Sequence, residues 1–118
     1  MATIGVSPKA GKELENLKNH FGFNSEKDAA LFAMAYALSN ELPHSPVTNK
    51  ITKWGTSSFN VAELEGIFSV FYPDFSYDEQ TMISLMEGLI HAGIYELTKI
   101  VDENKYVKLS DLLPLIES

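Results

Sequence analysis

The stretch SEKDAALFAMAYALSN, residues 25–40, decides the fold. It carries no charge between Ala29 and Leu38 and is rich in Ala, Leu and Met, which favour helix. Ser25 is placed to cap the first turn, where Asp28 adds a favourable negative charge. A surface helix shows one apolar stripe, whereas this one is apolar on nearly all sides. It must therefore be covered on most sides, and we expect a second copy of the chain to complete that cover.

Size and composition predict one folded domain. The chain has 118 residues, 45% of them hydrophobic, which suits a single core. It has no cysteine, which excludes disulfides, thiolate metal sites and a cysteine nucleophile. We see neither the apolar segment of a signal peptide nor the run of about 20 apolar residues that a membrane span needs. We therefore expect a cytoplasmic protein without a membrane partner.

The charge is unevenly distributed along the chain. The net charge is −7, with six Lys and five acidic residues in residues 1–60 but three Lys and eleven acidic residues in residues 61–118. There is no Arg, although Lys and Arg supply most contacts to DNA phosphates. Any DNA-binding surface should thus lie in the N-terminal half. The simplest interpretation of the acidic half is a solvated, solubilising face.

The first 40 residues predict a strand followed by two helices. Residues 2–6 form a short strand, which needs a pairing partner from elsewhere, for example from another subunit. A Ser-Pro pair then begins a helix over residues 8–21, which Gly22 ends. The second helix covers residues 25–39.

The middle of the chain predicts a loop. Residues 41–58 contain two Pro, one Gly and a run of Thr and Ser. Such a long loop needs anchors, and we expect Ile51 and Trp54 to hold it to the core. A contact between Trp54 and a partner is the alternative.

Two capping patterns begin the later helices. Asn60 with Glu63 precedes one helix, which ends before Pro73, and Ser76 with Glu79 precedes the next. Gly93 predicts a break in that second helix. Residues 94–109 then either continue as helix, which we favour slightly, or pair as a hairpin, and a last short helix begins near residue 110.

These elements predict a mainly α fold, with five or six helices and a short N-terminal strand in one domain, residues 1–118. Residues 1–40 form a strand-helix-helix oligomerisation segment, 41–58 a loop, and 59–118 an acidic helical segment. We expect a homodimer or tetramer whose interface uses five residues of the central helix: Leu31, Phe32, Met34, Ala35 and Leu38.

The sequence contains no complete catalytic, metal-binding or cofactor-binding motif, and we expect a protein that is not an enzyme. Glu87 and His91 are spaced to share a metal on one helix face, but two ligands do not make a site. We interpret them as a surface pair. Residues 5–12, GVSPKAGK, depart from a phosphate loop in spacing and are followed by Glu13 instead of Ser or Thr.

The strand, the helix with a glycine exit and the capped apolar helix over residues 2–40 resemble the ribbon-helix-helix arrangement. The resemblance implies that two chains pair their strands, share a core of second helices and insert the paired strands into the DNA major groove. The residues available at the strand are ATIGV, of which only Thr3 suits a base edge.

A second resemblance rests on residues 23–40, FNSEKDAALFAMAYALSN, and on residues 88–97, GLIHAGIYEL. Both are similar to stretches of small accessory proteins encoded beside bacterial DNA phosphorothioation (Dnd) defence genes. This resemblance implies a non-catalytic part of a defence or DNA-modification system.

The sequence thus leaves two functions open. The first is an oligomeric, DNA-associated accessory or regulatory protein, with DNA contacts from Thr3, Lys9, Lys12 and Lys27. The second is an acidic protein-interaction subunit or DNA mimic within a larger complex. Its partner-binding candidates are Trp54, Glu63, Glu65, Asp78 and Glu79.

Overall fold

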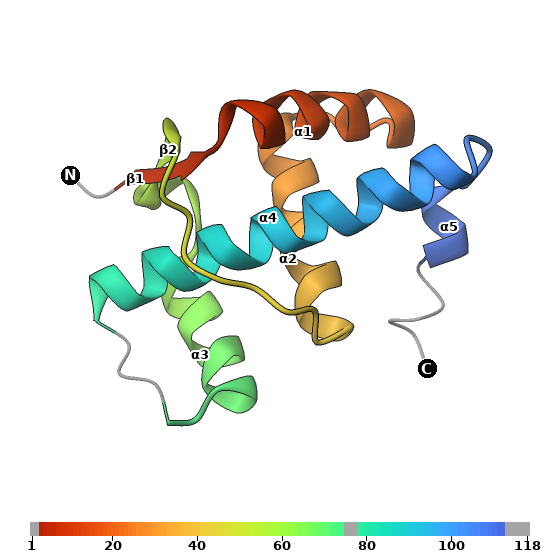
Figure 1. The fold of residues 1–118 in the computed structure, drawn as a ribbon. Coiled ribbons are helices and arrows are strands. Elements are labelled where there is room, and N and C mark those ends of the chain that lie inside the picture. Colours follow the sequence, from red (N-terminus) through yellow and green to blue (C-terminus); the bar gives the residue numbers. More distant parts are fainter. Residues whose placement is uncertain (1–2, 75–77, 113–118) are drawn as a thin grey trace.

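A long helix, α4 (Glu79–Glu103), runs through the middle of the molecule, and the other elements are arranged around it (Figure 1). The computed structural model describes residues 3–74 and 78–112. Helices α1 (Pro8–Phe21) and α2 (Glu26–Ser39) pack on α4 and on each other. The described residues also form α3 (Val61–Phe71) and the short α5 (Leu109–Leu112), so the predicted mainly helical fold is confirmed.

The predicted caps of the first two helices are confirmed. Ser7 Oγ accepts a hydrogen bond from the Ala10 amide at 3.1 Å. Gly22 ends α1 in the left-handed conformation, with φ of 76°, which glycine adopts without strain. Ser25 Oγ accepts from the Asp28 amide at 3.1 Å and starts α2. Local sequence chemistry therefore sets these helix ends.

The start of α4 differs from the prediction. Asp78 is its N-cap, and its Oδ1 accepts from the Thr81 amide at 2.8 Å. The predicted cap, Ser76, lies outside the described residues. By contrast, the predicted cap of α3 is confirmed, since Asn60 Oδ1 accepts from the Glu63 amide at 3.2 Å.

Helix α4 continues through Gly93 without a break, which corrects one prediction and confirms another. A Cβ atom on Gly93 would overlap the carbonyl group of Ala33 in α2. The glycine therefore allows the two helix backbones to touch and does not end the helix. Helix continues to Glu103, so the helical alternative for the start of residues 94–109 is confirmed over the hairpin.

The predicted loop over residues 41–58 contains a strand. β2 (Ile51–Gly55) pairs antiparallel with β1 (Thr3–Val6), and a 3₁₀ turn follows at Thr56–Ser58. The strand at the N-terminus therefore finds its partner in the same chain. The two strands are shifted in register between Ile4 and Gly5.

The two predicted anchors of this segment behave differently. Trp54 is half-buried and packs edge-to-face on Phe59, with ring centroids 5.8 Å apart, so its anchoring role is confirmed. Ile51 is 61% exposed, and its predicted anchoring role is wrong. Ile51 lies at one end of β2, whose first three residues all face solvent.

The apolar helix α2 is covered mainly by its own chain. In the run Ala29–Leu38, only Ala35 is exposed, while Leu31 and Phe32 are half-buried and the remaining residues are buried. The inference that this helix needs a second copy for its cover is therefore wrong, because α1 and α4 supply most of the contact.

Two of the predicted interface residues are core residues of the single chain. Met34 and Leu38 are both buried among the side chains of the main hydrophobic cluster, so neither is accessible to a second copy. Leu31, Phe32 and Ala35 stay accessible, and self-association through them remains a prediction.

In the described part of the chain, no helix has the length and apolar character needed to cross a bilayer.

Candidate functional site

The junction between α4 and β1 contains a buried charge. Glu87 is 1% exposed, and its Oε2 accepts from the Gly5 amide at 2.8 Å. Its Oε1 lies 2.7 Å from Lys50 Nζ, on the segment leading into β2. A carboxylate buried in this way needs such partners, since desolvation penalises its charged form. Glu87 thus ties together α4, β1 and the start of β2.

His91 continues this junction one turn later. Its Nε2 accepts from the Ser7 amide at 3.1 Å, and Nδ1 donates to the Glu87 carbonyl at 2.7 Å. Glu87 and His91 are therefore not a surface pair, which corrects the prediction. Among the described residues, no group of three His, Asp or Glu side chains is placed to hold a metal ion.

These bonds also close one side of β1. The amides of Gly5 and Ser7, two residues apart, donate to α4 side chains instead of to β2. β1 is thus paired with β2 and bonded to α4 through the Gly5 amide, and Ser7 adds a second bond to α4 directly after the strand. Pairing of β1 with the same strand of a second chain would have to break these bonds.

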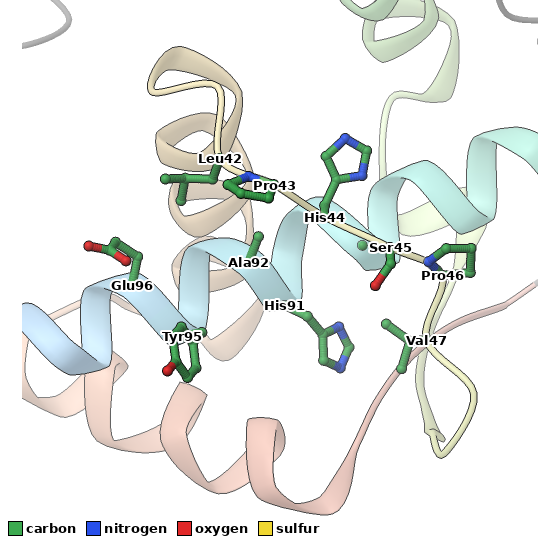
Figure 2. Close-up of a pocket in the computed structure, with 11 residues that line it drawn as sticks. Leu42, Pro43, His44, Ser45, Pro46, Val47, His91, Ala92, Tyr95 and Glu96 are labelled. Carbon is green, nitrogen blue, oxygen red and sulfur yellow. The ribbon is translucent and has the colours of Figure 1, made fainter.

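A second feature is the extended segment 42–47, which crosses α4 and borders a pocket of about 410 Å³ (Figure 2). Figure 2 shows His44 and His91 pointing away from each other, on opposite sides of this segment. His44 Nε2 lies 3.1 Å from the Tyr72 hydroxyl, and burial lowers the pKa of His44 below its usual value. The pocket therefore does not join the two histidines into an acid-base pair.

The third feature is a hollow of about 220 Å³ between α3 and the start of α4. Met82, Ile83 and Met86 contribute apolar side chains, while Glu65 and Glu79 contribute carboxylates. We call this the acidic hollow; its full lining is Thr56, Val61, Glu65, Glu79, Met82, Ile83 and Met86.

The structure brings together part of the predicted partner-binding set. Glu65 and Glu79 share the acidic hollow, and Asp78 is exposed beside Glu79. Hydrogen bonds from Thr81 lower the pKa of Asp78, which fits its capping role. Glu63 and Trp54 do not line the hollow, since Glu63 bonds to the Asn60 side chain and Trp54 packs on Phe59.

The predicted DNA-contacting residues differ in their exposure and in their hydrogen bonds. Lys9 and Lys12 are exposed at the start of α1. Lys27 is half-buried and donates to the Ser58 carbonyl at 3.2 Å. Thr3 is half-buried, with its hydroxyl 3.5 Å from that of Thr52.

Sequence reasoning missed one surface entirely. Ile67, Val70 and Phe71 are apolar residues of α3 that remain exposed. The signal was present, because residues 61–71 carry apolar side chains on more than one side of the helix.

Comparison with known proteins adds no relative to these observations: no protein-family model, no curated protein and no solved structure matches the chain.

Proposed function

We propose that the chain is a non-catalytic interaction subunit that binds a basic protein partner at its acidic end, where α3 meets the start of α4. The observation that carries this proposal is the acidic hollow, whose lining combines the carboxylates of Glu65 and Glu79 with apolar side chains. Among the described residues, the two ion pairs are Lys50–Glu87 and Lys53–Glu26, so neither carboxylate of the hollow is neutralised by a described cation.

The shape and chemistry of the hollow suit a lysine or arginine side chain. The aliphatic stem of such a side chain packs on apolar surface while its charged end stays at the rim. Met82 and Met86 line the hollow from the core side, and their flexible thioether side chains can adjust to an incoming stem. The two carboxylates then accept charge-assisted hydrogen bonds from the cation.

The test is capture of a partner from the native host, identification of that partner, and reconstitution of the purified pair. We expect the double variant Glu65→Lys, Glu79→Lys to lose the partner. The control is Glu15→Lys, which changes charge on an exposed position of α1 and should keep it. Retention of the partner by the double variant would show that the acidic end is only a solvated face.

A DNA-associated accessory function, of the kind implied by the two resemblances, is the second candidate. Exposed Lys9 and Lys12 at the start of α1 favour it. Contact through paired strands of two chains is disfavoured, since β1 is already paired with β2 and bonded to α4 through the Gly5 amide. A gel-shift titration at low salt tests this candidate with Lys9→Glu, Lys12→Glu as the variant, because the contacts would be mainly to phosphate. No shift of DNA by the wild-type chain would exclude it.

A further inference from the structure

Helix α3 has two apolar faces, and only one of them faces the core. Phe68 is fully buried, with Val61 and Leu64 half-buried beside it. The other apolar residues, Ile67, Val70 and Phe71, are exposed by 40%, 77% and 45%. Their spacing of three and four residues places them on one side of the helix. We call these three residues the α3 stripe.

The stripe leads into a hollow in the surface. Phe71 and Tyr72 line a pocket of about 340 Å³ together with the end of α2 and the residues after it, namely Leu38, Glu41, Leu42, Pro43 and His44. Figure 1 shows α3 on the opposite side of α4 from α1, at the lower edge of that view. A contiguous apolar surface with an adjoining hollow is typical of a protein contact site.

Carboxylates lie at both ends of the stripe. Glu63 precedes Ile67 by four residues on the same side of α3, and Glu41 lines the hollow beside Phe71. Neither is paired with a cation in the described part of the chain, where the ion pairs involve Glu87 and Glu26. An occupant of this surface therefore needs apolar side chains along its middle and positive charge at its ends.

We infer that the α3 stripe docks a cationic amphipathic helix of the protein partner, an inference that rests on the proposed function. An amphipathic helix presents apolar residues at the spacing of the stripe, which is the usual geometry of a helix bound along a groove. Its flanking Lys or Arg residues meet Glu63 and Glu41.

A second copy of the chain fits this surface less well. Pairing two α3 helices would bring together surfaces of the same negative charge, since residues 61–118 hold eleven acidic residues against three Lys.

The test uses two synthetic peptides of about 18 residues, or five helical turns. Both carry the same leucine stripe, one with lysine and the other with glutamate at the polar positions. Binding to the full chain is measured by fluorescence anisotropy of the labelled peptide. We expect the lysine peptide to bind and the glutamate peptide not to bind.

The decisive variant is Val70→Asp. It adds a negative charge, so electrostatics alone would tighten binding of the lysine peptide, whereas loss of the apolar contact should weaken it about tenfold or more. Ala62→Asp is the matched control, because it adds the same charge at another exposed position of α3. It should leave binding unchanged or slightly tighter. Thermal melts verify that both variants are folded, which the exposure of both positions predicts.

Each other outcome overturns the inference in a distinct way. Absence of lysine-peptide binding to the wild-type chain at low salt removes it. Equal binding by wild type and Val70→Asp, with loss in Glu65→Gln, Glu79→Gln, would place the contact at the acidic hollow, so this inference fails while the proposed function stands. Sedimentation showing a wild-type dimer that Val70→Asp dissociates would assign the stripe to a second copy.

Discussion

Replacing Gly93 by alanine tests the backbone contact between α2 and α4. A Cβ atom at this position would overlap the carbonyl oxygen of Ala33 and would crowd its carbonyl carbon and Cα as well. All three atoms belong to the backbone, so no side-chain rotation relieves the overlap. The methyl group fits only if α2 and α4 move apart, although these two helices form the most extensive contact between elements.

The magnitude follows from two opposing effects. Inserting a methyl group into a packed core costs about 1–3 kcal/mol, and the upper end applies here because backbone must move. Alanine favours helix over glycine by about 1 kcal/mol. We therefore expect Gly93→Ala to lower the free energy of unfolding by about 2 kcal/mol. For a domain of this size, that corresponds to a melting temperature lower by about 8 °C.

The assay is urea unfolding followed by circular dichroism, with a thermal melt alongside. Gly66→Ala is the matched control, because Gly66 lies inside α3 and a Cβ atom added there would meet nothing within 4 Å. Helix preference then acts alone, and this variant should gain up to about 1 kcal/mol. A Gly93→Ala protein as stable as the wild type would refute the close approach of α2 to α4.

Three further predictions concern stability. The variant Glu87→Ala should lower the free energy of unfolding in urea by about 3 kcal/mol or more, because the buried Gly5 amide loses its acceptor and Lys50 loses its partner. Glu87→Gln keeps one acceptor oxygen and should lower it less, and equal stability of both variants and the wild type would contradict this. Burial lowers the pKa of His44 below 6.5, so the contribution of this residue to stability is complete above pH 6.5 and is lost as the pH falls through the folded-state pKa. The melting temperature should therefore fall less steeply between pH 7.5 and pH 5 for His44→Gln than for the wild type. Equal slopes would count against the role of this ring. Ala33→Asp should prevent folding, since this core position is fully buried, while Ala35→Asp should fold normally because Ala35 is exposed; sedimentation of the folded variant then tests whether α2 takes part in any self-association.

Features set by neighbouring residues were predictable from the sequence. The caps at Ser7, Ser25 and Asn60 each use a side chain three residues before the amide that it accepts from. The end of α1 at Gly22 uses a backbone bond to the Lys18 carbonyl, four residues earlier. The mainly helical fold follows from the same local signals. Features that join distant parts of the chain were not predictable in this way.

Strand β2 is an example of such a distant feature. It lies among Thr, Ser and Gly, and its first three residues are exposed, so it carries no apolar alternation to identify it. Its pairing with β1 spans about 50 residues of chain. Similarly, the cover of α2 could not be predicted without knowing that α4 is one unbroken helix of 25 residues that packs against it.

The candidate surfaces were found only in part. Acidic composition pointed to Glu65 and Glu79, which the acidic hollow brings together. The buried role of Glu87 was missed, although a lone acid within the apolar stretch from Met82 to Ile94 was a usable signal. The second apolar side of α3 was missed, although residues 61–71 carry apolar side chains on more than one side of the helix.

The bonds that hold β1 and α1 have a consequence for how the chain matures during synthesis. Gly5 bonds to a residue 82 positions later, Ser7 to one 84 positions later, and His20 to one 87 positions later. The bonds of Gly5 and Ser7 therefore form only after the first half of α4 has been translated, and the bond of His20 only after all of α4. Such long-range closure is slow, and it leaves the emerging apolar segments without their final cover until the last helices have been made.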